Sequence, residues 1–96
     1  MGIDFLDLNF RVEKRFGVQL HVADFPPEIL HNNALLTAGL YSDTVQRKIN
    51  ARLRGTGQPE AGDVWPQVRD LIAATVQMDP HEITPESRLI QDLGYT

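Results

Sequence analysis

The sequence predicts an all-α fold, with three substantial helices and one or two short helical turns in a single domain covering residues 1–96. Three observations support this prediction. Apolar residues recur at helical spacing in residues 3–17, 42–54 and 64–78. No segment alternates apolar and polar residues as a half-buried strand does. The chain has 96 residues, 42% of them hydrophobic, which suits one small core.

The composition excludes several classes of protein. The absence of cysteine rules out disulfides, thiolate metal sites and a cysteine nucleophile. No apolar run approaches the roughly 20 residues that span a bilayer, and Asp4 and Asp7 lie where a signal peptide would carry positive charge. We therefore expect a cytoplasmic protein without membrane insertion. A net charge of −4 argues against nucleic-acid binding, which needs a basic face, and favours basic partners.

The first predicted helix covers residues 3–17, and Gly17 is its stop signal. One stripe of apolar residues, at offsets 0, 3, 7 and 11, is predicted to face the core: Phe5, Leu8, Val12 and Phe16. A second apolar row lies beside that stripe: Ile3, Leu6 and Phe10. Together the two rows are wider than burial against one neighbour requires, so we expect part of this arc to face a partner.

Residues 18–39 and 55–63 are predicted to be irregular. The Pro26-Pro27 step prevents a helix before it, and Pro27 to Leu30 can form one short turn. Residues 55–63 combine three glycines with a proline and contain no large apolar residue. We expect them to be a linker that adds nothing to the core.

Helices over residues 42–54 and 64–78 are predicted from N-cap residues and apolar spacing. Ser42 is the expected N-cap of the first of these helices and Asp63 that of the second. Their apolar stripes are Val45, Ile49 and Leu53 in the first, and Val64, Val68, Leu71, Ile72 and Val76 in the second. Residues 79–96 are predicted to be a loop. Within it, Thr84 and Pro85 begin one helical turn, and the apolar residues that follow point back to the bundle: Leu89, Ile90 and Leu93.

Two stretches resemble the acyl carrier proteins. Residues 65–94 are similar to that family's first helix and first loop, in the V-x-x-I/L-I-A spacing, the D-P-x-E-I-T-P-E-S turn and the D-L-G before the attachment site. Residues 3–20 resemble its second helix, with the aspartate just after the attachment serine and the F-G terminator. The halves are in reversed order, and 65–96 followed by 2–54 reads as an uninterrupted carrier whose last helix is 42–54. The resemblance implies a circularly permuted four-helix bundle of acyl-carrier type, bridged by 55–63.

The resemblance also locates the family's attachment position. In the motif D-L-G-x-D-S-L/I-D, the serine carries 4′-phosphopantetheine, whose thiol holds acyl chains as thioesters in fatty-acid, lipid or polyketide synthesis. In this chain Gly2 has the serine's place, and Thr96 precedes it in register. Glycine has no hydroxyl, so the family's cofactor is expected to be absent here. Neither Ser42 nor Ser87 follows a D-L-G.

Two further sets of residues take their expected roles from the resemblance. The family's partners are acyl-transfer, synthase and phosphopantetheinyl transferase enzymes with basic patches. They would dock on the outer side of the first predicted helix, at Ile3, Asp4, Leu6, Asp7, Phe10 and Glu13. An acyl chain would lie in a cavity lined by Leu8, Val12, Phe16, Val68, Leu71, Ile72, Leu89 and Leu93. Without the resemblance, Asp4 and Asp7 in the first turn would simply stabilise the helix through its dipole, by about 0.3 to 1 kcal/mol each, and the apolar set would be ordinary core.

Other functions have less support in the sequence. No catalytic group is predicted, because no carboxylate pair or oriented histidine is suggested by the pattern, and we expect no enzyme activity. The histidines are scattered, without metal-ligand spacing: His21, His31 and His81. Two alternatives to an acyl carrier remain: an interaction module on the carrier fold that binds carrier-recognising enzymes without a prosthetic group, and an unrelated small helical protein. A monomer is favoured over a swapped dimer, because a nine-residue linker can reach roughly 30 Å.

Overall fold

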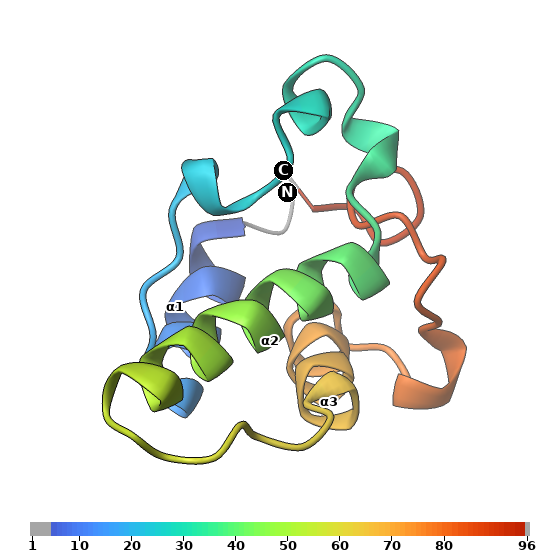
Figure 1. The fold of residues 1–96 in the computed structure, drawn as a ribbon. Helices are drawn as coiled ribbons and strands as arrows, with labels where there is room; N and C mark the ends of the chain where they lie inside the picture. Colours follow the sequence, from blue (N-terminus) through green and yellow to red (C-terminus); the bar gives the residue numbers. More distant parts are fainter. Residues whose placement is uncertain (1–4, 96) are drawn as a thin grey trace.

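The fold is seen in a computed structural model that describes residues 5–95. Within this range there are three α-helices, four short 3-10 turns and no strand. Figure 1 shows α1 (Phe5–Phe16) and α2 (Ala38–Gly55), with α3 (Trp65–Val76) packed beside them. The predicted all-α class is therefore confirmed.

The core forms where the three helices meet, and α3 contacts both α1 and α2. Each helix contributes fully or almost fully buried apolar residues: Leu8 and Val12 from α1, Tyr41, Val45 and Ile49 from α2, and Val68 and Ile72 from α3. The C-terminal loop adds Leu89, which is also fully buried. Most of these residues belong to the apolar stripes predicted from the sequence, but Tyr41 lies before the predicted helix 42–54, so helical periodicity identified only part of the core.

Helix α1 ends as its sequence predicts. The Gly17 backbone has φ +68°, and its N–H donates to the Glu13 carbonyl at 2.8 Å. Arg52 of α2 approaches this turn and donates from Nη1 to the Gly17 carbonyl at 2.8 Å. A Cβ at position 17 would lie 2.5 Å from that Nη1 atom, so both the backbone angle and the close approach favour glycine.

Helix α2 begins four residues before the predicted start at Ser42. The N-cap is Thr37, whose Oγ1 accepts the Leu40 N–H at 3.1 Å, and Ser42 is buried inside the helix. The reason is a tertiary contact. The C-terminal loop brings two carbonyls to the first turn, where Ala38 N–H donates to Ser87 and Gly39 N–H to Pro85, both at 2.8 Å. These bonds satisfy helix donors that local sequence leaves open.

Helix α3 starts close to its predicted position. Its N-cap is Val64 and not the predicted Asp63, although the Asp63 carboxylate accepts the Trp65 N–H at 3.0 Å. The helix ends at Val76, two residues before the predicted end, because Gln77 follows as the C-cap in the left-handed conformation with φ +58°. The linker before α3 does more than predicted. Its Ala61 is partly buried against the core, and the Ala61 N–H donates to Asn50 of α2 at 3.1 Å. The expectation that residues 55–63 add nothing to the core is wrong, because α2 has amide side chains that bind their backbone.

The irregular segments contain the short 3-10 turns. The predicted turn after Pro26 is present as η2 (Pro27–Leu30), and two turns that were not predicted flank it: η1 (Val22–Asp24) and η3 (Asn33–Leu35). In the C-terminal loop the helical turn is η4 (Pro80–Glu82), and the turn expected at Pro85 is a non-helical turn. Asp79 explains the earlier position, since its carboxylate accepts the His81 N–H at 2.9 Å.

Candidate functional site

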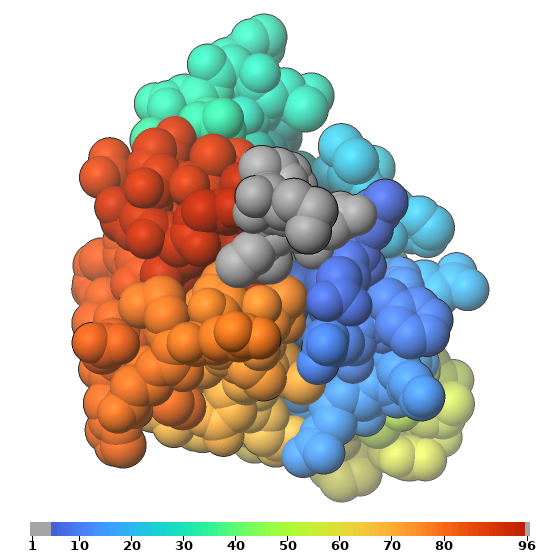
Figure 2. All heavy atoms as spheres, turned by 180° about the vertical axis from the view of Figure 1, so that it is seen from behind, coloured from blue at the N-terminus to red at the C-terminus, as the bar shows by residue number. Residues whose placement is uncertain are grey.

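The two ends of the described chain lie side by side (Figure 1). The Phe5 and Tyr95 rings have centroids 5.0 Å apart, and Tyr95 is only 1% exposed. The Tyr95 N–H donates to the Leu89 carbonyl at 3.0 Å, and burial raises the pKa of Tyr95 to about 12. This contact therefore places the end of the C-terminal loop against the start of α1. Seen from behind, the same face has α3 packed along α1 (Figure 2).

The D-L-G motif ends this loop in a defined conformation. Asp92 accepts the Arg88 backbone N–H at 2.8 Å and the Arg88 guanidinium at 3.0 and 3.2 Å. The Arg88 side chain and backbone hold the pKa of Asp92 below its usual value. Gly94 follows with φ +83°, a backbone angle that favours glycine. The acid and the glycine of the motif thus shape the turn that brings Tyr95 to α1.

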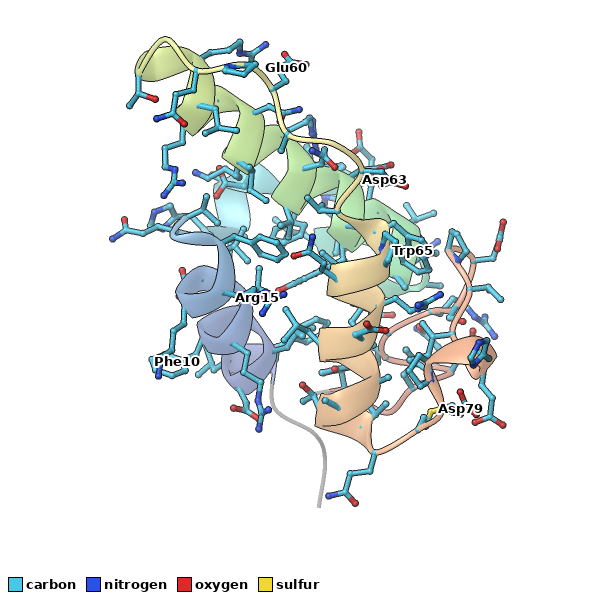
Figure 3. All side chains as sticks on the ribbon, turned by 90° about the horizontal axis from the view of Figure 1, so that it is seen from below. Phe10, Arg15, Glu60, Asp63, Trp65 and Asp79 are labelled. Carbon is cyan, nitrogen blue, oxygen red and sulfur yellow. The ribbon has the colours of Figure 1, made fainter. Side chains whose placement is uncertain are left out.

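Four of the residues predicted to bind partners can be placed on α1, and all four lie on or near its outer side. Leu6 is 73% exposed and Phe10 62% exposed, and Figure 3 shows Phe10 pointing away from α3. The two acids have partners within the chain. Asp7 accepts from Arg11 at 3.3 Å, and Glu13 accepts the Leu20 N–H at 2.7 Å. The outer side of α1 therefore presents more apolar surface than free negative charge. The roles predicted for Gly2, Ile3 and Asp4 fall on residues outside the described range.

The residues predicted to line an acyl cavity are packed in the core. Five of them are fully buried: Leu8, Val12, Val68, Ile72 and Leu89. Leu93 is 8% exposed, and Phe16 and Leu71 pack against the core from its edge. None of the eight lines the large pocket of the described structure. Their role as a cavity lining stays a prediction.

That pocket has a volume of about 690 Å³ and lies between α1, residues 20–30 and the start of α2. Its walls are mainly apolar. Helix α1 contributes Phe5, Leu6 and Asn9, and the start of α2 and the residue before its cap contribute Tyr41 and Leu36. The remaining wall comes from the irregular segment: Leu20, His21, Val22, Ala23, Phe25, Pro26, Pro27, Ile29 and Leu30.

A single polar pair lies within this apolar lining. The Tyr41 hydroxyl donates to Asn9 Oδ1 at 2.5 Å, which joins α2 to α1. Burial raises the pKa of Tyr41 well above its usual value, so the hydroxyl remains a donor at neutral pH. The Phe25 ring lies 5.8 Å from the Tyr41 ring, measured between centroids, and covers it from the irregular segment.

The irregular wall is attached to α2 through Asp24. Its carboxylate accepts the His21 N–H at 2.8 Å and the Lys48 ammonium at 3.2 Å. Sequence reasoning missed this pocket because the segment has no periodicity. The available signal was compositional, since residues 20–30 are rich in large apolar side chains and proline although they form no α-helix.

Residues 5–95 contain no group of three histidine, aspartate or glutamate side chains arranged to hold a metal ion. None of the helices in this range is long and apolar enough to cross a membrane.

Comparison with models of protein families, with curated proteins and with solved structures gives no match for this chain.

Proposed function

We propose that this chain is an acyl-carrier-type bundle whose two halves follow each other in exchanged order, and that it serves cytoplasmic enzymes of fatty-acid, lipid or polyketide synthesis. In this proposal α3 corresponds to the family's first helix, α1 to its second and α2 to its last. The observation that supports it best is the contact between the Phe5 and Tyr95 rings, 5.0 Å apart. Tyr95 follows the D-L-G of the proposed motif, and Phe5 follows the residues proposed to complete it, so this contact supports the proposed register.

The packing of the helices supports the same assignment. Helix α3 contacts both α1 and α2, as a central element of a small bundle does. The loop between α3 and Tyr95 returns over the start of α2, where Leu89 N–H donates to the Leu36 carbonyl at 3.0 Å. Exchanging the order of the halves leaves these contacts unchanged, because domain termini and loops tolerate rearrangement when they lie at the surface.

The residues present do not fit a covalently attached 4′-phosphopantetheine. The corresponding position is Gly2, which offers no hydroxyl and lies outside the described residues. The two serines do not replace it. Ser42 is buried within α2, and the Ser87 Oγ accepts the Thr84 N–H at 3.0 Å in the C-terminal loop. No thioester step is therefore assigned to this chain.

A second candidate function is a non-catalytic interaction module, which binds carrier-recognising enzymes without a prosthetic group. The observation that favours it is the outer side of α1, where Leu6 and Phe10 are exposed beside Asp7. Such a surface fits an acyl-transfer or synthase enzyme with an apolar centre and a basic rim. In both functions the chain acts as a monomer.

The proposed register is tested by restoring the hydroxyl. The unchanged chain and a Gly2→Ser variant are incubated with coenzyme A and a phosphopantetheinyl transferase of broad specificity, and their intact masses are recorded. We expect the variant to gain one phosphopantetheine and the unchanged chain to gain none, because a helix N-terminus favours the phosphate and only serine supplies the nucleophile.

A Gly2→Ala variant is the matched control, and it is expected to keep its mass. Circular dichroism establishes that all three chains have the same helix content. A folded Gly2→Ser variant without a mass change would overturn the proposed register. A mass gain on the unchanged chain would mean that a different hydroxyl is used.

A further inference from the structure

The pocket beside α1 has the chemistry of a binding site that is separate from covalent attachment. We propose that it binds, without a covalent bond, an amphiphile of the fatty-acid class, with one apolar tail and one head that accepts hydrogen bonds. This inference rests on the proposed function, because enzymes of fatty-acid synthesis would supply such chains. The class of ligand follows from the walls of the pocket.

The size and walls of the pocket suit an apolar tail. Its volume of about 690 Å³ falls within the range of small-molecule sites, about 300 to 1,000 Å³. Three large apolar side chains of its lining are also exposed. Leu6, Val22 and Leu30 line the pocket and are 72 to 73% exposed, although each belongs to a different element of the chain. Exposed apolar residues that share one pocket are typical of a ligand site, because a bound tail removes them from water.

Asn9 supplies the group that recognises the head. Its Oδ1 accepts the Tyr41 hydroxyl, which fixes the side-chain amide so that Nδ2 faces away from Tyr41. In residues 5–95 this Nδ2 donates to no protein atom, and no buried side-chain nitrogen or oxygen lacks a partner. The Nδ2 atom is therefore accessible, on a residue that lines the pocket. It offers two N–H donors to a carboxylate or carbonyl oxygen.

The lining of the pocket offers hydrogen-bond donors and no carboxylate. No described aspartate, glutamate, lysine or arginine lines it, and His21 is its one titratable wall residue apart from the buried Tyr41. Asp24 and Glu28 belong to the irregular wall without lining the pocket, and Asp24 is bound by Lys48 at 3.2 Å and by the His21 N–H. A carboxylate head would therefore meet donors, whereas an ammonium head would meet no carboxylate among the lining residues.

The test compares two amphiphiles with the same tail, decanoate and decylammonium, by titration calorimetry on the full chain below their micelle concentrations. We expect one decanoate to bind per chain, about tenfold more tightly than decylammonium, because hydrogen bonds to a charged group contribute about that much. Equal binding of the two amphiphiles, or no binding of decanoate, would overturn the inference.

Asn9→Asp tests the named donor. This variant keeps an acceptor for the Tyr41 hydroxyl but replaces the Nδ2 donors with a carboxylate oxygen. We expect decanoate to bind about tenfold more weakly and decylammonium more tightly. An unchanged preference in the folded variant would show that Asn9 does not recognise the head.

The location is tested with a pair of variants that change the net charge equally. Ala23→Asp adds a carboxylate to the pocket wall, and Ala74→Asp adds one to an exposed position of α3 outside the pocket. We expect the first to weaken decanoate about fivefold or more and the second to leave it unchanged, because screening limits charge effects to roughly 10 Å. Equal effects would place decanoate elsewhere.

This inference and the proposed function can fail separately. If decanoate does not bind but the Gly2→Ser variant still gains phosphopantetheine, only this inference is overturned. If decanoate binds but the Gly2→Ser variant gains no mass, only the proposed function is overturned.

Discussion

At the scale of single residues, three hydrogen bonds hold the irregular segment and the adjoining helices in place. Glu13 of α1 accepts the Leu20 N–H at 2.7 Å, Asp24 accepts from Lys48 of α2 at 3.2 Å, and Asn9 accepts from Tyr41 at 2.5 Å. Backbone that forms neither helix nor strand needs such partners, because a polar group left without a hydrogen bond on burial costs about 1 to 3 kcal/mol. Glu13, expected to face partners, is thus also a structural residue.

Asp24 gives the molecule an acid-sensitive contact. Burial raises the pKa of Asp24, but hydrogen bonds from the His21 N–H and from Lys48 outweigh it and hold the pKa below 3.8. A carboxyl group with a lowered folded-state pKa stabilises the fold above its unfolded pKa, and this contribution is lost as the pH falls through the folded value. We therefore expect Asp24→Asn to lower the free energy of unfolding by about 1 kcal/mol at pH 7, and by less at pH 2.5. Urea unfolding at both pH values measures this.

The control for this prediction is Asp43→Asn, which changes an exposed acid of α2. We expect its effect at pH 7 to stay within about 0.5 kcal/mol. An equal loss of stability for Asp24→Asn at both pH values would contradict the proposed role of the charge.

At the scale of the elements, the sequence was informative where local signals decide the structure. Apolar spacing and the stop at Gly17 placed α1, and Asp63 indicated the start of α3 to within one residue of its N-cap, Val64. The start of α2 could not be predicted in this way. Its first donors are satisfied by the carbonyls of Pro85 and Ser87, and a sequence window around Ser42 contains no sign of them.

The same limit applies to the candidate site. The outer row of α1 could be predicted because one helix presents it, and Leu6 and Phe10 are indeed exposed. The large pocket could not, since its walls come from α1, from the irregular segment 20–30 and from the start of α2. Only the folded chain brings these three together, and the apolar composition of the irregular segment was the one local sign of a shared surface.

The two possible starts of α2 can be distinguished by mutation. Thr37→Ala removes the side chain that accepts the Leu40 N–H, and we expect it to lower the free energy of unfolding by about 1 kcal/mol. Ser42→Ala changes a residue inside the helix, where alanine is the better helix former, so its effect should stay within about 0.5 kcal/mol. Urea unfolding measures both. A larger loss for Ser42→Ala would favour the start expected from the sequence.

At the scale of the whole molecule, one chain closes on itself. The radius of gyration is 13.1 Å, close to the roughly 12.5 Å expected for a compact chain of this length. The linker returns from α2 to α3 along α2. Gln46 binds it at two points, donating to the Gly62 carbonyl at 3.2 Å and accepting the Val64 N–H at 2.8 Å. The linker thus has a fixed path at its end, which favours packing of α3 within its own chain over exchange between chains.

The exchanged order itself can be tested by reversing it. We expect residues 61–96 followed directly by residues 2–57 to form the same three helices and to unfold cooperatively, with a free energy of unfolding within about 2 kcal/mol of the original chain. The new peptide bond has little distance to cover. Five peptide steps would link Tyr95 to Phe5 and can span roughly 17 Å, whereas the two rings are 5.0 Å apart.

Circular dichroism and urea unfolding measure the outcome, and light scattering gives the mass in solution. Because residues 61–64 are retained, the bonds from Gln46 and Asn50 to this stretch are preserved. The matched control joins the same ends but opens the chain before Gln46, inside α2, which interrupts a buried helix and is expected to prevent cooperative folding. If the rearranged chain failed to fold while the original folded, the ends would not be neighbours in solution. The exchanged-order proposal would then lose the contact between Phe5 and Tyr95 that supports it.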